Sequence, residues 1–69
     1  MNEHALADYN AAIKADPQLD TTYYARAYLY EEQGKEDLAI ADYKRFLELS
    51  TDSTWRDEAE LRLKALLEP

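Results

Sequence analysis

The residues best suited to chemistry in this chain are His4 and Asp8, which lie four positions apart near its start. On a helix this spacing puts both side chains on one face, where an imidazole and a carboxylate can contact the same metal ion. Two ligands do not make a metal site, and the chain has neither a second histidine nor a cysteine. We therefore expect a pair of surface side chains here and no bound metal.

Covalent and acid–base catalysis also lack the residues that they usually need. The sequence contains no cysteine nucleophile, no second histidine to act as a base and no glycine-rich phosphate loop, since Gly34 is its only glycine. Its fifteen acidic residues fall on faces expected to be exposed, where no cleft would raise a carboxyl pKa. The sequence therefore predicts a protein that is not an enzyme and that uses no cofactor.

Composition limits the size of the fold and the kinds of partner. Sixty-nine residues make one small domain, and 46% apolar residues are enough for a packed core. The net charge of −7 argues against nucleic acid and anionic membranes, because both attract clustered lysine and arginine. This negative charge either keeps the protein soluble or favours the binding of basic partners. The chain has no membrane-spanning apolar run, no signal-peptide pattern at its start and no cysteine, so a cytoplasmic location is favoured.

A five-residue sequence occurs twice in the chain. Ala5-Leu6-Ala7-Asp8-Tyr9 returns thirty-four positions later as Ala39-Ile40-Ala41-Asp42-Tyr43, with four of the five residues identical. A fixed period of this size is typical of repeat proteins, in which each unit is one pair of helices stacked on its neighbour. The repeat therefore indicates an architecture, and it points to the binding of other proteins as the class of function.

Turn signals divide the chain into four segments. Pro17 interrupts the first link, Gly34 lies in the second, and residues 50–53 form a third link of small polar side chains. Proline cannot continue a helix, glycine tolerates the conformation that ends many helices, and short polar side chains compete for backbone hydrogen bonds. The segments between them predict helices over roughly 3–15, 21–33, 36–49 and 54–67. Period-two alternation is absent, so we expect no strand, and such short links make neighbouring helices antiparallel.

Each segment carries apolar residues three and four positions apart, which places them on one stripe of a helix. The expected core residues, in chain order, are Ala5, Tyr9, Ala12, Ile13, Tyr23, Ala27, Tyr30, Ala39, Ile40, Tyr43, Phe46, Leu47, Trp55, Ala59, Leu63 and Leu66. Asp20 and Ser53 are the expected N-caps of the second and fourth helices. Pairs of an acid and a base four apart, Glu58–Arg62 and Glu60–Lys64, would each add about 0.2–0.5 kcal/mol on an exposed face.

These residues resemble the tetratricopeptide repeat, whose 34-residue unit of two antiparallel helices follows the pattern W-x2-L-G-x2-Y, then A-x3-F, then P. Residues 20–53 match one complete unit, with Gly34 at its turn, and the residues in register are Tyr23, Ala27, Tyr30, Ala39 and Tyr43. Residues 1–19 are similar to the second half of a preceding unit, and residues 54–69 to a capping helix or the start of a further repeat. The resemblance implies one all-α domain over residues 1–69, with antiparallel helical hairpins stacked as a short right-handed solenoid of about four helices.

Three departures from the family pattern bear on packing. Arg26 stands where the family has leucine, and we expect its stem to pack while its charge stays in water. Phe46 stands where alanine is preferred, which enlarges the contact on that side and suggests that the next helix is displaced. Trp55 falls two places early for its family position, so we expect the last helix to be shifted or to act as a cap.

In this family the first helices of successive units line a concave groove that holds peptides, so the resemblance implies a protein-interaction module or scaffold. The groove-facing positions here are Thr21, Tyr24, Tyr28, Glu31 and Glu32. This aromatic and acidic strip would suit a basic or aromatic peptide. The alternative is that the tyrosines are half-covered surface and the acids a solvated face. Some family members clamp a C-terminal carboxylate with cations, but tyrosine and alanine occupy those places here, so we do not expect such a ligand.

Self-association is a second function that the sequence leaves open. The first helix carries a flank of alanines that would normally meet a preceding helix, namely Ala7, Ala11 and Ala15. Stacked repeats need neighbours to bury such faces, and a homodimer or a swapped helix would supply one. The competing explanation is that the segment belongs to a longer array.

Overall fold

The computed structural model describes residues 2–68, which form four α-helices and no strand, as the sequence predicts. Residues 1 and 69, the two ends of the predicted domain, lie outside the described residues. None of the described helices combines the length and the apolar character that crossing a membrane requires. The helices are α1 (Asn2–Ala15), α2 (Asp20–Glu32), α3 (Glu36–Leu49) and α4 (Ser53–Leu67).

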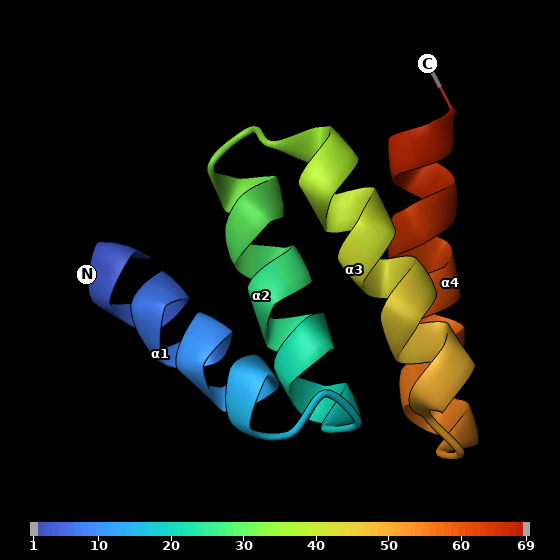
Figure 1. The fold of residues 1–69 in the computed structure, drawn as a ribbon. Helices are drawn as coiled ribbons and strands as arrows, with labels where there is room; N and C mark the ends of the chain where they lie inside the picture. The colour runs from blue at the N-terminus through green and yellow to red at the C-terminus, as the bar shows by residue number, and fades with distance from the viewer. Residues whose placement is uncertain (1, 69) are drawn as a thin grey trace.

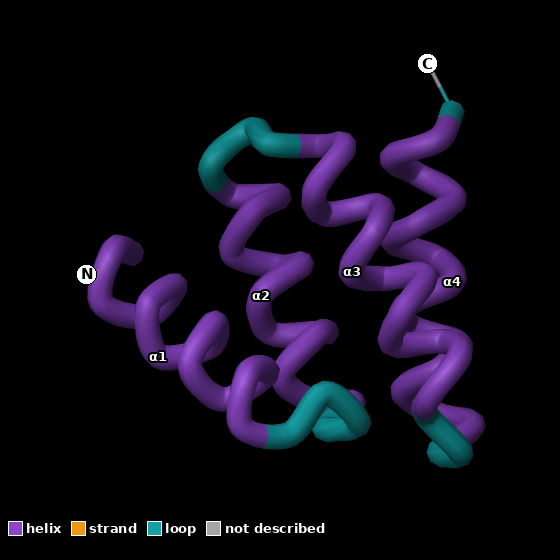
Figure 2. The backbone as a smooth tube through the Cα atoms, viewed as in Figure 1, coloured by secondary structure: helices purple, strands orange, loops and turns teal. Residues whose placement is uncertain are grey.

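Each helix packs against the next one along the chain (Figure 1). The largest contact joins α2 and α3, and α4 then packs against α3. The connections between helices are short turns, which make successive helices antiparallel (Figure 2). At its C-terminal end α1 lies close to α2, and it diverges from α2 toward the N-terminus of the chain (Figure 1). The molecule is therefore a stack of helical hairpins, as expected for an all-α repeat fold.

The core lies where α2, α3 and α4 meet, and it combines small residues with aromatic rings. Ala27, Ala39 and Ala59 are fully buried, which lets the three helices approach closely. The ring of Tyr43 is also fully buried. The buried cluster consists of Tyr23, Ala27, Ala39, Tyr43, Phe46 and Ala59. Of the other expected core residues, five are partly buried and pack against this cluster, namely Ile13, Tyr30, Leu47, Leu63 and Leu66. Ala5, Tyr9, Ala12 and Ile40 are partly buried outside it, and the expectation is wrong for Trp55, which is 53% exposed.

The two copies of the repeated pentad differ in burial. Ala39 and Tyr43 of the second copy are fully buried, whereas Ala5 and Tyr9 of the first are only half-buried. The difference follows from the stacking, because α3 packs against both α2 and α4 while the main contact of α1 is with α2. The same sequence thus occupies an inner position once and an outer position once.

The turns lie where the sequence places them, but the N-caps are displaced by one residue. Asp52, and not Ser53, caps α4, because its side chain accepts hydrogen bonds from the backbone N–H groups of Thr54 and Trp55. In α2 the N-cap position is occupied by Leu19, and Asp20 is the first residue of the helix. Gly34 has a φ of 77°, the left-handed value that glycine adopts without strain.

Candidate binding face

The five predicted binding residues lie along one face of α2. Thr21, Tyr28 and Glu32 are exposed, while Tyr24 and Glu31 are partly buried. The structure connects three of them, Tyr24, Tyr28 and Glu31, to Arg62 of α4. Thr21 lies apart from this group, beside a pocket at the start of α2. Glu32 makes no side-chain hydrogen bond or ion pair within residues 2–68.

Tyr24 is the residue through which α2 contacts both neighbouring helices on this face. Its ring meets the rings of Tyr43, Phe46 and Trp55 edge-on, with centroid distances of 5.6, 5.2 and 5.4 Å. Edge-to-face pairs at this range are favourable, by about 0.5–1.5 kcal/mol each beyond the area that they bury. The aromatic half of the face is therefore a packed cluster and holds α4 against α2.

Arg62 organises the polar half of the face. Its Nε donates to the hydroxyl oxygen of Tyr24 at 3.0 Å and lies 3.3 Å from the Glu58 carboxylate. Its Nη1 lies 3.8 Å from Glu31, and its guanidinium stands over the Tyr28 ring, 5.1 Å from the centroid. The predicted pair Glu58–Arg62 is present, whereas Glu60–Lys64 forms no ion pair within the described residues.

Glu31 also accepts a hydrogen bond from a residue of the buried core. The Tyr43 hydroxyl donates a hydrogen bond to Oε1 of Glu31 at 2.7 Å. Burial raises the pKa of Tyr43 above its ordinary value, and the hydrogen bond to Glu31 raises it further. The carboxylate of Glu31 therefore takes part in internal contacts with Tyr43 and Arg62, which leaves it less available to a partner than the sequence suggested.

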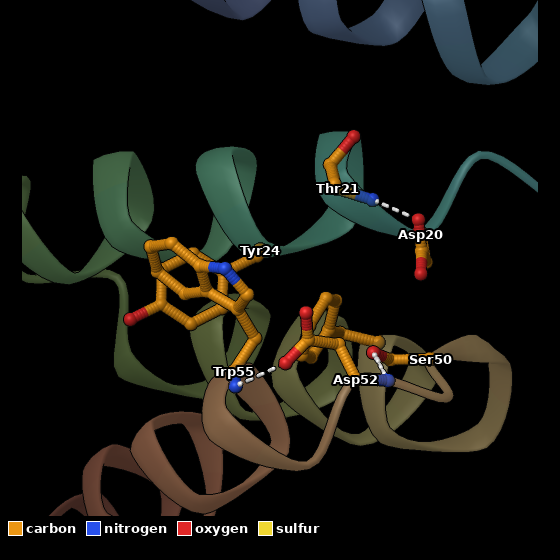
Figure 3. Close-up of a pocket in the computed structure, with 7 residues that line it drawn as sticks. Asp20, Thr21, Tyr24, Ser50, Asp52 and Trp55 are labelled. Atoms are coloured by element: carbon orange, nitrogen blue, oxygen red, sulfur yellow. Dashed lines mark hydrogen bonds between the residues drawn. The ribbon is translucent and has the colours of Figure 1, made fainter.

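A pocket of about 450 Å³ opens at the end of the face where α2 and α4 both begin. Figure 3 shows side chains of α2 on one side of this pocket and those around the α3–α4 turn on the other. Ligand-binding clefts typically range from about 300 to 1,000 Å³, so its size is sufficient to hold a side chain of a partner. Its lining residues are Asp20, Thr21, Tyr24, Phe46, Ser50, Asp52 and Trp55.

Sequence reasoning placed Thr21 and Tyr24 on the binding face but missed the other residues of this pocket. Phe46 is 2% exposed and packs against Tyr24, and Trp55 lies across from them with half of its surface open to solvent. A signal was present in the sequence, because Phe46 and Trp55 both depart from the family pattern. Both departures meet at the pocket.

At Arg26, which also departs from the family pattern, the structure contradicts the expectation that the charged group stays in water. Its guanidinium does not stay in water but forms a two-pronged ion pair with Asp42, with N–O distances of 2.7 and 2.8 Å. The Asp42 side chain is only 6% exposed, and its hydrogen bond is the main reason that the pKa of Arg26 is raised. Arg26 also donates to the side-chain oxygen of Asn10 at 2.8 Å. This network ties α1 to the α2–α3 hairpin and lies away from the Tyr24 face of α2.

His4 and Asp8 are both exposed on α1. Across residues 2–68, no three histidine, cysteine or acidic side chains come close enough together to hold a metal ion.

Comparison with known proteins identifies the repeated unit. A family model described as tetratricopeptide repeat matches residues 20–53. The chain is 38% identical over 50 residues, 72% of its length, to DnaJ homolog subfamily C member 3 of Rattus norvegicus. It is 40% identical over 52 residues, 75% of its length, to the protein of the same name from Gallus gallus. The matched stretch spans about 10% of each of these relatives. No solved structure matches the chain.

Proposed function

Residues 20–53 place this chain in the tetratricopeptide repeat family, and from that premise we propose that it binds a partner protein or peptide along the face formed by α2 and α4. Repeats of this family serve in general as protein–protein interaction modules. The finer proposal concerns which face binds and which chemistry it favours. The predicted residues Thr21, Tyr24, Tyr28, Glu31 and Glu32 supply the α2 half of that face.

The observation that carries this proposal is the pocket between the N-terminal ends of α2 and α4, with an exposed aromatic ring beside it. Trp55 lines the pocket and is 53% exposed, and Tyr28 is 43% exposed further along the same face. Tryptophan and tyrosine are enriched among the residues that contribute most to binding at protein interfaces, because they bury a large area and keep a polar tip. A concave, partly aromatic surface of this kind suits an extended peptide.

The charge of the face favours a basic or aromatic partner. Two acids, Asp20 and Asp52, line the pocket, and Glu32 lies exposed at the other end of α2. The chain as a whole carries a net charge of −7, which attracts cationic partners at low ionic strength. An acidic peptide would meet like charges on this face.

Peptide selection followed by chemical-shift mapping tests the proposal. Random twelve-residue peptides displayed on phage are selected against the immobilised chain, and the tightest binder is titrated into the isotopically labelled protein. We expect shifts at the amides of Thr21, Tyr24 and Tyr28 and at the indole N–H of Trp55. Tyr28→Ala should weaken binding, whereas Leu38→Ala, at an exposed apolar residue of α3, should not. Shifts concentrated on α1 would contradict the proposal.

Self-association through α1 is the second candidate function. It is supported by the half-burial of Ala5 and Tyr9, whose counterparts in α3 are fully buried, and by the exposure of Ala7, Ala11 and Ala15. A second copy of the chain packed on this flank would bury α1 as α3 is buried. Light scattering across a wide range of protein concentration tests it, and a constant monomer mass would contradict it.

A further inference from the structure

We infer that the pocket between the starts of α2 and α4 accepts a lysine or arginine side chain of the bound peptide. The inference rests on the function proposed above, and it adds which side chain of the partner enters the pocket. It follows from three features of the pocket: aromatic walls, two acids at its edge and the absence of a cation among its lining residues.

The walls suit the stem of a long cationic side chain. Phe46 and Tyr24 pack edge-on against each other at one side, and Trp55 contacts Tyr24 while half of its own surface stays exposed. The methylene groups of lysine or arginine pack readily on such rings while the charged end reaches water or an acid. A cation near the face of tryptophan gains a further attraction from the ring's quadrupole.

Two carboxylates are placed to receive the charged end. Oδ1 of Asp20 accepts the backbone N–H of Thr21 at 2.7 Å, and Oδ1 of Asp52 accepts the N–H groups of Thr54 and Trp55 at 3.0 and 3.3 Å. Within residues 2–68, the second oxygen of each carboxylate accepts no hydrogen bond, and neither acid forms an ion pair. Each carboxylate is therefore held in place by its helix and still has an oxygen for a ligand.

The acids at the other end of the same face differ in this respect. Glu31 and Glu58 both contact Arg62, so an internal cation already offsets part of the charge of these two acids. Arg56, a cation close to the pocket in sequence, donates to the backbone oxygens of Leu47 and Ser50 and does not line the pocket. Glu32 is a further exposed acid of this face without an ion pair within residues 2–68, but it does not line the pocket, whereas Asp20 and Asp52 place two unpaired carboxylates at the pocket itself.

An anion and a purely apolar side chain both fit this pocket less well. Helix starts often bind anions, but here Asp20 and Asp52 already occupy N–H groups at the starts of α2 and α4, so a second anion would meet two like charges. An apolar side chain would cover the rings but would also remove water from the two carboxylates without replacing it. A cationic side chain satisfies both the rings and the acids.

The experiment compares matched peptides by a signal that arises in the pocket itself. Trp55 is the only tryptophan of the chain, so its fluorescence reports on this pocket alone. The probes are the acetylated and amidated heptapeptide GSLKLSG and two forms in which arginine or norleucine replaces the lysine. Norleucine keeps the stem and removes the charge. We expect the lysine and arginine peptides to bind about three- to tenfold more tightly than the norleucine peptide, and the difference to shrink in high salt.

Two variants test the acids directly, and a third is their control. Asp20→Asn and Asp52→Asn should each reduce the preference for the cationic peptides, and asparagine keeps the capping hydrogen bond at position 52, so the fold should persist. Asp57→Asn makes the same charge change at an exposed residue of α4 that does not line the pocket, and it should leave the preference unchanged. Circular dichroism checks that all three variants are equally helical.

The outcomes separate this inference from the function on which it rests. If the norleucine peptide binds as tightly as the lysine peptide and shifts the same resonances of α2 and α4, the cationic side chain is the wrong ligand, while the binding face stands. If the peptides shift only resonances of α1, both the inference and the binding face are wrong. If none of the three peptides perturbs Trp55 or the neighbouring amides at millimolar concentration, the inference is overturned.

Discussion

The hydroxyl group of Tyr43 on α3 is hydrogen-bonded to the carboxylate of Glu31 on α2 at a distance of 2.7 Å. The Tyr43 side chain is fully buried, and Glu31 also contacts Arg62 of α4. Three helices therefore meet at one carboxylate, next to the aromatic cluster around Tyr24. This arrangement makes the stability of the core depend on keeping the phenol of Tyr43 neutral.

We expect the free energy of unfolding to fall as pH rises above about 10, because the pKa of Tyr43 is raised in the folded state by burial and by the hydrogen bond to Glu31. The folded protein holds the Tyr43 proton at pH values at which the unfolded chain has lost it. The stabilising contribution is therefore complete below pH 10 and is lost as pH rises toward the folded-state pKa, with a limiting slope of about 1.4 kcal/mol per pH unit. Urea unfolding measured between pH 8 and 11 checks this.

Tyr43→Phe is the control for that pH dependence. The variant keeps the ring and loses the hydroxyl group, so it should cost about 1 kcal/mol at neutral pH and should flatten the alkaline slope. An equally steep slope in this variant would assign the pH dependence to other tyrosines.

Breaking the Arg26–Asp42 ion pair should destabilise the fold more than an exposed pair would. Arg26→Leu restores the residue that the family prefers but leaves the Asp42 carboxylate, which is 6% exposed, without its partner. We expect a loss of about 2–3 kcal/mol, somewhat below the 3–5 kcal/mol typical of a fully buried pair, because the arginine side chain is 19% exposed.

The double variant Arg26→Leu, Asp42→Ala shows whether the cost comes from the unpaired charge. It should be more stable than Arg26→Leu alone, because no buried carboxylate is left without a partner. Urea unfolding of the wild type, both single variants and the double variant completes the cycle. A double variant whose loss equals the sum of the single losses would contradict this account.

The arrangement of the helices could be predicted from the sequence because it depends on local signals. Pro17 and Gly34 act within their own turns, and the apolar stripes that carry Ala27 on α2 and Ala39 on α3 depend only on helical spacing. Each signal could therefore be interpreted without knowledge of the rest of the fold. The predicted helix boundaries accordingly agree with the observed ones to within one residue at each end.

The features that sequence reasoning missed depend on contacts between distant residues. Arg26 lies 16 positions from both Asn10 and Asp42, and nothing local indicates that the three side chains meet. The spacing placed Trp55 on the apolar stripe of its helix, but its ring lies at the edge of α4 beside Tyr24. Pockets arise where helices diverge, so Asp52 and Trp55 could not be assigned to one without the relative placement of α2 and α4.

The cap of α4 provides a prediction that separates two neighbouring residues. Asp52→Ala removes the acceptor of two backbone N–H groups and should cost about 1 kcal/mol, whereas Asp52→Asn keeps an acceptor and should cost much less. Ser53→Ala should have little effect, although the sequence had suggested Ser53 as the cap. Thermal unfolding followed by circular dichroism measures all three. A larger loss for Ser53→Ala than for Asp52→Ala would contradict the observed cap.

Trp55 and Phe46 line the same pocket but should respond differently to truncation. Trp55 is 53% exposed but its ring packs edge-on against Tyr24, so Trp55→Ala should cost about 1–2 kcal/mol of stability. It should weaken the binding of the selected peptide by about thirtyfold, as expected for an aromatic binding anchor. Phe46 is 2% exposed, so Phe46→Ala should cost about 3–5 kcal/mol of stability and unfold much of the protein.

Leu61→Ala is the matched control, because Leu61 is a 66% exposed apolar residue of α4 outside the pocket and its truncation should affect neither stability nor peptide binding. Calorimetric titration measures the binding and urea unfolding the stability. Peptide affinity that is unchanged in Trp55→Ala would show that the partner does not use this end of the face.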